Sequence, residues 1–259
     1  MMKLSATTIG AGPDLVLLHG WGMNRAVWGG LPERLAQHYR VTLPELPGHG
    51  ESEYDPAGPS LDHWVEACLD AAPERAAWIG WSLGGQIAQR AALLQPERVT
   101  ALAVVAGTPR FVQGAGWPHA MAEETLRQFA ADLAADPRHT LERFLALQVR
   151  GDNQARATLR TLRHDLFERP DPVPGALRAG LELLQGVDLR SQLPALTCPV
   201  LWLLGARDTL VPAAVAGEVA QLLPQARVVV VPQAAHAPFL SHPERCFATL
   251  CEFLEANLG

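Results

Sequence analysis

Cysteine is scarce in this chain and follows no recognisable pattern. Only Cys68, Cys198, Cys246 and Cys251 occur in 259 residues, with no CxxC pair and no cysteine–histidine set at metal-ligand spacing. Four cysteines in so long a chain do not make a disulfide framework, so we expect reduced and mostly buried thiols. We predict no metal site and no cofactor.

The sequence also shows no long apolar run, no signal-peptide pattern and no net positive charge. No apolar stretch approaches the ~20 residues that a membrane-spanning helix needs. Met1–Ser5 lacks the apolar core of a signal peptide. The net charge of -6 argues against a general nucleic-acid binder. We therefore expect a cytoplasmic protein without a membrane or nucleic-acid partner, and we expect it to be a monomer.

The composition favours a folded α/β protein. Apolar residues make up 48% of the chain, which is ample for a core, and seven of its few aromatic residues are tryptophans. The length allows one large domain or two small ones. The order of strand-like and helix-like segments decides between these possibilities.

Strand-like runs alternate with helical patterns at both ends of the chain. Apolar runs typical of buried strands occur at 15–18, 76–79, 99–107 and 199–205. Further strands are predicted at 40–43 and 226–231, with a weak edge strand at 3–9. Helical patterns occur at 27–39, 61–72, 85–94 and 243–257. This alternation predicts parallel βαβ units in a mostly parallel sheet flanked by helices.

The middle of the chain has a different texture. Residues 110–185 hold no comparable strand-like run and read as helices separated by glycine and proline breaks. We interpret them as a helical cap inserted into a core domain formed by residues 1–109 and 186–259.

The segment Gly80-Trp81-Ser82-Leu83-Gly84 fits G-x-S-x-G and stands between a predicted strand and a predicted helix. That context is typical of a nucleophile elbow, in which a strained turn projects the serine hydroxyl at a helix N-terminus. The flanking glycines would let strand and helix pass closely. A chance match is the alternative, because glycine and serine are common.

His19-Gly20-Trp21-Gly22 follows the predicted strand 15–18. The glycines would let the backbone turn an N–H group, that of Trp21, toward the space above Ser82, as in an oxyanion hole. The alternatives are a plain glycine-rich turn and, for the Trp21 indole, either a wall of the substrate pocket or ordinary core packing.

A serine hydroxyl needs a base, and the base needs an orienting carboxylate. Asp208 and His236 each follow a predicted strand, so both would lie at the carboxyl edge of the sheet with Ser82. The order Ser82, Asp208, His236 is that of an α/β-hydrolase. His242 is the rival base, although it falls at a helix start, and Asp188 is the rival acid, although it follows no strand.

With these motifs, the chain resembles the α/β-hydrolase superfamily and, more closely, the pimeloyl-[acyl-carrier protein] methyl ester esterases of biotin synthesis. The resemblance covers nearly the whole length. It rests most specifically on Trp81-Ser82-Leu83-Gly84-Gly85 together with Phe144-Leu145-Ala146-Leu147-Gln148. Many superfamily members carry aspartate where Glu45 stands, which concerns loop packing more than chemistry.

The resemblance implies a role for each matching residue. Ser82 would be the nucleophile, Asp208 the orienting acid, and His236 the general base and then acid. The N–H groups of Trp21 and Leu83 would form the oxyanion hole. The expected substrate-binding residues are Trp21, Ser82, Leu83, Phe144, Leu145, Ala146, Leu147, Gln148 and His236.

Arginines cluster in the predicted cap. Residues 138–163 contain six arginines against Glu142 and Asp152, and Arg156, Arg160 and Arg163 recur at spacings that share one helix face. Acyl carrier proteins are acidic, so such a face would suit one. Together with the resemblance, this favours carrier docking at Arg138, Arg143, Arg156, Arg160 and Arg163. An ordinary solvated helix face is the alternative.

The expected activity is hydrolysis of the methyl ester of a pimeloyl group carried on acyl carrier protein. Three alternatives stay open: a carboxylesterase or lactonase acting on small esters, a dehalogenase or epoxide hydrolase, and a non-catalytic binding protein. Dehalogenases and epoxide hydrolases need aspartate where Ser82 stands. The complete set of serine, aspartate and histidine disfavours a binding protein.

Overall fold

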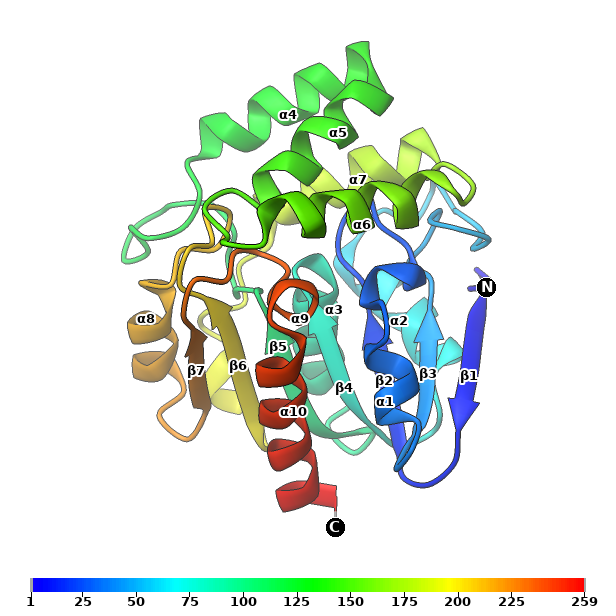
Figure 1. Ribbon diagram of the computed structural model, residues 1–259, viewed down its shortest axis with the longest axis vertical. Helices are drawn as coiled ribbons and strands as arrows, with labels where there is room; N and C mark the ends of the chain where they lie inside the picture. Colours follow the sequence, from blue (N-terminus) through cyan, green and yellow to red (C-terminus); the bar gives the residue numbers. More distant parts are fainter. Residues whose placement is uncertain (1, 259) are drawn as a thin grey trace.

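The computed structural model describes residues 2–258, which build one seven-stranded sheet covered by helices (Figure 1). The strand order is β1-β3-β2-β4-β5-β6-β7. The strands are β1 Ala6–Gly10, β2 Asp14–Leu18, β3 Arg40–Pro44, β4 Ala76–Trp81, β5 Val99–Val105, β6 Val200–Gly205 and β7 Arg227–Val231. All neighbours pair in parallel except β1, which is antiparallel to β3, so the expected mostly parallel sheet is confirmed.

The central strand β4 shows why its sequence is continuously apolar. It pairs with β2 on one side and β5 on the other, and all six of its residues are buried. A parallel strand covered on both faces has no solvent side, so alternation of polar residues is absent. The seven tryptophans of the chain are likewise all buried.

Helices cover both faces of the sheet. On one face, α10 (Pro243–Leu258) packs against α1 (Leu31–Leu35) and β5, and it lies in front of the sheet in Figure 1. On the other face, α3 (Leu83–Leu94) packs against β4 and β5, and α2 (Leu61–Ala71) packs on α3. The remaining core helices are α8 Val215–Leu222 and α9 Pro238–Ser241.

The prediction of one continuous helix over 27–39 is wrong. The chain instead forms a 3₁₀ turn, η1 (Arg25–Trp28), and the short α1, separated by Gly29 and Gly30. Gly29 has φ 55°, a left-handed conformation that ends the first turn. The apolar spacing across this segment reflects two short elements packed on the same core. A second 3₁₀ turn, η2 (Leu193–Ala195), precedes β6.

Four helices lie above the carboxyl ends of the strands (Figure 1). We call these helices and the loops that join them the cap. They are α4 Glu123–Ala135, α5 Pro137–Gln148, α6 Ala155–Phe167 and α7 Pro174–Gly186. They pack on one another, and α6 also packs on η1 and α9 of the core. Residues 111–121 carry two isolated β-bridges, Val112 to Met121 and Gly114 to Trp117, which the sequence did not suggest. The cap boundaries at 110 and 185 stay a prediction.

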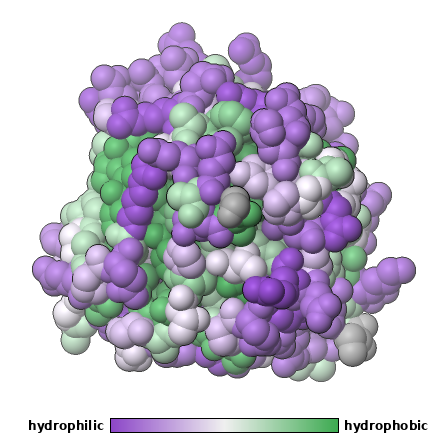
Figure 2. Space-filling view, turned by 90° about the horizontal axis from the view of Figure 1, so that it is seen from below, coloured by the Kyte–Doolittle hydropathy of each residue, from purple (hydrophilic) through white to green (hydrophobic). Residues whose placement is uncertain are grey.

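The face opposite the cap is mostly hydrophilic, with apolar areas among the polar ones (Figure 2). Within residues 2–258, none of the helices combines the length and apolarity required to cross a bilayer.

Candidate active site

Ser82 stands at the sharp turn between β4 and α3. Its backbone has φ 56° and ψ −119°, a combination that residues other than glycine rarely adopt. Its N–H donates to the Val105 carbonyl at 3.0 Å, which anchors the turn to β5. The strained elbow expected from the sequence is therefore present.

The glycines around Ser82 are required by close backbone approach. A Cβ at Gly80 would lie 2.3 Å from the Gly84 carbonyl oxygen. A Cβ at Gly84 would lie 2.3 Å from the Leu18 oxygen and 2.5 Å from the His19 oxygen. The first turn of α3 thus rests directly against the chain leaving β2, and this brings the His19–Gly22 loop to Ser82.

His236 and Asp208 reach Ser82 from the ends of β7 and β6. The His236 Nε2 lies 2.9 Å from the Ser82 hydroxyl oxygen, and its Nδ1 lies 2.8 Å from Asp208 Oδ2. All three side chains are buried. The other oxygen of Asp208 accepts the backbone N–H groups of Leu210 and Val211, at 2.8 and 3.0 Å.

These contacts fix the histidine tautomer. An ionised carboxylate only accepts hydrogen bonds, so Nδ1 of His236 carries the proton that faces Asp208. Nε2 is then the basic nitrogen, and it faces the Ser82 hydroxyl. The arrangement is able to take the hydroxyl proton and keep it within the site.

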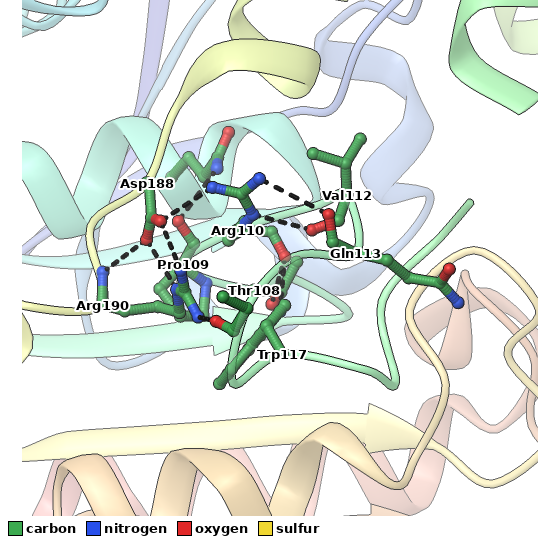
Figure 3. A network of polar contacts seen from close by, with 10 residues as sticks. Thr108, Pro109, Arg110, Val112, Gln113, Trp117, Asp188 and Arg190 are labelled. Atoms are coloured by element: carbon green, nitrogen blue, oxygen red, sulfur yellow. Dashed lines mark hydrogen bonds and ion pairs between the residues drawn. The ribbon is translucent and has the colours of Figure 1, made fainter. Parts of the chain in front are cut away.

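The rival residues lie elsewhere. The Asp188 carboxylate binds the guanidinium groups of Arg190 at 2.7 Å and Arg110 at 2.8 Å (Figure 3). The hydrogen bond from Arg190, reinforced by Arg110, holds the pKa of Asp188 well below its usual range. His242 lies just before α10, and its Nδ1 is 2.9 Å from the Ser241 hydroxyl oxygen. Neither residue joins the Ser82–His236–Asp208 chain.

The loop after β2 lies against Ser82, as its glycines led us to expect. A Cβ at Gly20 would be 3.1 Å from Ser82 Cβ. Within residues 2–258 the Trp21 backbone N–H donates to no protein atom. The Leu83 N–H is the first of α3 and so has no intrahelical acceptor. Two N–H groups without such acceptors therefore lie beside the serine turn.

His49 holds this loop, and sequence reasoning missed it. Its Nε2 accepts the Gly22 N–H at 3.2 Å, while its Nδ1 donates to the Pro47 carbonyl at 2.9 Å. His19 is used similarly: it accepts the Leu46 N–H at 3.0 Å and donates to the Gly20 carbonyl at 2.9 Å. The only signal in the sequence was a histidine between two glycines in a loop at the carboxyl edge.

The Trp21 indole contacts the cap and does not line the cavity beside Ser82. Its N–H donates to the Leu177 carbonyl of α7 at 2.8 Å, and its ring meets Phe144 edge-on with centroids 4.8 Å apart. The candidate oxyanion loop is thus connected to two cap helices through one side chain.

A small, mostly apolar cavity adjoins the Ser82 hydroxyl. The volume open to the centre of a water-sized sphere is about 10 Å³, which is room for about one water molecule. The lining residues are Ser82, Phe111, Met121, Leu126, Phe144, Leu184, Leu210 and His236. An acyl chain needs more room than this, so its entry requires movement of the lining side chains or of the helices that carry some of them.

The five expected substrate-binding residues of α5 are not all at this cavity. Phe144 lines it, Leu145 is fully buried, and Ala146 is exposed. Leu147 lines a separate groove between α4 and α5 with Phe129 and Arg143. The Gln148 side-chain amide is buried and has no hydrogen-bond partner among residues 2–258. Helical geometry explains the dispersal, because five consecutive residues span more than one turn.

A larger hollow, of about 600 Å³, lies at the amino ends of the strands, on the face shown in Figure 2. It is open, and neither serine nor histidine lines it. Its cysteine, Cys198, is no nucleophile, because burial raises the pKa of the thiol to about 11. The small cavity at Ser82 is the better candidate, because Ser82 and His236 line it and His236 also contacts Asp208.

The expected docking arginines are all exposed, but they are not equally free. Arg143 pairs with Asp132, Arg163 pairs with Glu142 at 3.1 Å, and Arg138 stacks over Phe167 at 4.4 Å. In the described part of the chain, Arg156 and Arg160 on α6 have no carboxylate within ion-pair distance. These two have their charges available for a partner.

Glu45, which departs from the superfamily pattern, is buried under the loop that follows β3. One of its oxygens accepts the Glu51 N–H at 2.7 Å and lies 3.4 Å from Arg25. It has no contact with the Ser82–His236–Asp208 chain, in keeping with a role in loop packing. Across residues 2–258 no group of three or more histidine, cysteine, aspartate or glutamate side chains is placed to hold a metal ion.

Comparison with known proteins identifies the family of the chain. Residues 13–243 match the family model of the α/β hydrolase fold. The pimeloyl-[acyl-carrier protein] methyl ester esterase of Xanthomonas campestris pv. campestris (strain B100) is 48% identical over 248 residues, covering 96% of this chain and 97% of the relative. The enzyme of the same name from Nitrosomonas europaea is 46% identical over 253 residues, covering 96% and 100%.

A solved structure, the esterase from Exiguobacterium antarcticum, superimposes with a TM-score of 0.88 at 22% identity, covering 98% of this chain and 96% of that one. At that identity the likeness concerns the fold alone. The chain belongs to the α/β hydrolase fold family and, within it, to the pimeloyl-[acyl-carrier protein] methyl ester esterases.

Proposed function

We propose that this protein is a serine carboxylesterase that hydrolyses the methyl ester of a pimeloyl group on acyl carrier protein, releasing methanol. The observation that carries the proposal is the buried chain of contacts from Ser82 through His236 to Asp208 at a strained elbow. The substrate comes from the names of relatives that are 46–48% identical over nearly the whole chain.

In the proposed reaction, the Ser82 oxygen attacks the ester carbonyl while His236 Nε2 takes its proton. The developing oxyanion accepts the N–H groups of Trp21 and Leu83, and each such donor is worth roughly 2.7–4 kcal/mol. Asp208 keeps the imidazole oriented and stabilises its positive charge. His236 then protonates the departing methanol, and water releases the free acid from Ser82 by the same route.

The surroundings of the cavity suit an acyl chain. Phe111, Leu126, Phe144 and Leu184 offer apolar walls, and each methylene buried against them gains ~0.8 kcal/mol. Because this reward is small per carbon, the site alone selects chain length weakly.

Removing the nucleophile tests the reaction. Ser82→Ala should lower kcat for the methyl ester by at least about 10⁴-fold while circular dichroism stays unchanged. A fluorophosphonate probe should label the wild type and not this variant. Ser191→Ala, at an exposed serine, is the matched control and should behave as wild type. Full turnover by Ser82→Ala would refute the proposed mechanism.

The carrier and the pathway are tested separately. We propose that Arg156 and Arg160 bind the acidic carrier, because within residues 2–258 neither pairs with a carboxylate or stacks over an aromatic ring. We also propose a role in biotin synthesis. The wild-type gene should restore growth without biotin to a strain lacking this esterase, and the Ser82→Ala form should not. Cleavage of small esters without such rescue would favour a general carboxylesterase or lactonase.

A further inference from the structure

The turn that carries His236 is held from the cap as well as from the core. The His236 N–H donates to the Gln148 carbonyl at the end of α5, at 3.0 Å. The preceding N–H, that of Ala235, donates to Asp152 Oδ2 at 2.9 Å. From the core side, the Trp81 indole N–H donates to the His236 carbonyl at 2.7 Å. The backbone of the turn at Ala235 and His236 is therefore held by three hydrogen bonds, and cap residues accept two of them.

Asp152 lies in the loop that joins α5 to α6, and each of its two oxygens has a different partner. While Oδ2 accepts the Ala235 N–H, Oδ1 accepts the Gln154 N–H at 2.7 Å, just before α6 begins. The residue is 9% exposed. No cation lies within ion-pair distance of it in the described residues. A buried carboxylate satisfied by backbone N–H groups makes stronger hydrogen bonds than a neutral acceptor does.

The same loop also touches the turn that carries Asp208. A Cβ at Gly151 would lie 3.5 Å from Arg207 Cβ, so the loop rests on the residue before Asp208. The Arg207 N–H donates to the Ala234 carbonyl at 2.8 Å, which joins the two turns. The histidine turn itself begins at Gln233 with φ 63°, a conformation that persists only where the surroundings enforce it.

We propose that Asp152 is a positioning residue for His236: a cap carboxylate that fixes the turn of the catalytic base against Ser82. The inference rests on the proposed function, because it assigns His236 as the base. It follows from the tolerance of the chemistry, since displacing the turn by a fraction of an ångström lengthens the 2.9 Å contact between Nε2 and the serine oxygen. The cap thereby takes part in building the site as well as covering it.

Asp152→Ala removes both hydrogen bonds and is the first variant to measure. With a p-nitrophenyl ester, which needs no carrier, kcat should fall about tenfold while KM changes less than twofold. The low-field proton resonance of His236 Nδ1–H, assigned by its loss in His236→Ala, should broaden through faster exchange. Asp152→Asn keeps one oxygen acceptor, so it should recover part of the lost kcat.

Asp136→Ala is the matched control. The Asp136 carboxylate accepts the His139 N–H at 3.0 Å and caps α5, but it has no contact with the histidine turn. This variant loses a cap-helix hydrogen bond of the same kind and should keep wild-type kcat and the sharp resonance. If Asp152→Ala does not fold, as judged by circular dichroism, the comparison is made between Asp152→Asn and Asp136→Asn.

Two results would overturn the inference: wild-type kcat and resonance in the Asp152 variants, or equal losses in the Asp152 and Asp136 variants. Equal losses would mean that helix capping alone explains the effect. Failure of the proposed function looks different, because the wild type itself would then not hydrolyse the ester.

Discussion

At the scale of single residues, His19 and His49 support the site by holding its loops and are not part of the Ser82–His236–Asp208 chain. His19 and His49 are fully buried, and their rings lie 5.4 Å apart between centroids. Burial, reinforced by the neighbouring His49, lowers the pKa of His19 to about 3, and burial lowers the pKa of His49 to about 4. Each accepts a backbone N–H, so each must stay neutral to hold the loops around Ser82.

This predicts a specific loss of stability in acid. In the unfolded chain both histidines protonate near pH 6.5, whereas in the folded protein they stay neutral until about pH 4 and 3. The unfolded state therefore binds more protons below pH 6.5, and the free energy of unfolding falls as the pH drops. At pH 5 each histidine should have removed about 2 kcal/mol, measured by urea unfolding at pH 7 and pH 5.

Exposed His38 supplies the control for this pH effect. His49→Asn should lower stability at pH 7 but show a smaller further loss between pH 7 and pH 5 than the wild type. His38→Asn should leave the difference between the two pH values unchanged, because His38 is exposed. An unaltered pH dependence in His49→Asn would contradict the assignment.

At the scale of elements, cap helix α7 and the loop that carries Trp21 are in direct contact. A Cβ at Gly180 would lie 2.5 Å from Trp21 Cδ1, which is closer than two non-bonded carbon atoms can approach. The Trp21 indole also donates to Leu177 of the same helix. The position of α7 and the position of the Trp21 N–H are therefore coupled.

Gly180→Ala should expose this coupling. Alanine gains about 1 kcal/mol of helix propensity over glycine, but the collision with Trp21 costs about 1–3 kcal/mol, so stability should change little or fall. The displaced Trp21 N–H should lower kcat about tenfold, which is part of the value of one oxyanion donor. The measurements are ester kinetics and the midpoint of thermal unfolding.

The same helix offers the comparison for Gly180→Ala. A Cβ at Gly186 would meet nothing within 4 Å, so Gly186→Ala should be active and no less stable than wild type. If Gly180→Ala had wild-type kcat, the Trp21 N–H would not depend on α7.

At the scale of the whole molecule, exposed positive charges gather on the cap although the net charge of the chain is negative. Exposed arginines lie on the cap while the chain carries a net charge of -6, so an acidic partner would be attracted to the cap and repelled elsewhere. The small cavity beside Ser82 lies under the same helices, because Leu126, Phe144 and Leu184 line it. The proposed carrier docking and the proposed substrate entry thus involve the same part of the molecule.

Reversing two cap charges tests this arrangement. Arg156→Glu with Arg160→Glu should lower kcat/KM for the carrier-bound ester about tenfold or more, because two attractions become repulsions, and salt should reduce the difference. A p-nitrophenyl ester should be hydrolysed at the wild-type rate. Arg245→Glu, at an exposed arginine of α10, should alter neither activity. Equal losses with both substrates would argue against a docking role.

The sequence alone determined what depends on local chemistry and on strand order. The apolar runs predicted the parallel sheet because strands buried on both faces have no polar side, and Gly80 and Gly84 marked the serine turn because only glycine fits there. The positions of Asp208 and His236 after predicted strands were enough to bring them to one edge. Over 27–39 two local signals conflict. The apolar spacing predicts one helix, whereas Gly29, with its positive φ, ends the first turn and divides the segment into two short elements.

The tertiary structure decided everything that depends on contacts between distant segments. That Phe144 lines the cavity while Ala146 does not, that His49 holds Gly22, and that Asp152 reaches Ala235 across 83 positions left no periodic or compositional mark on the chain. A hydrogen bond between two loops requires no residue pattern along either of them. The contact between Ser82 and His236 could be predicted from motifs, whereas the hydrogen bonds that support it appear only once the loops are packed.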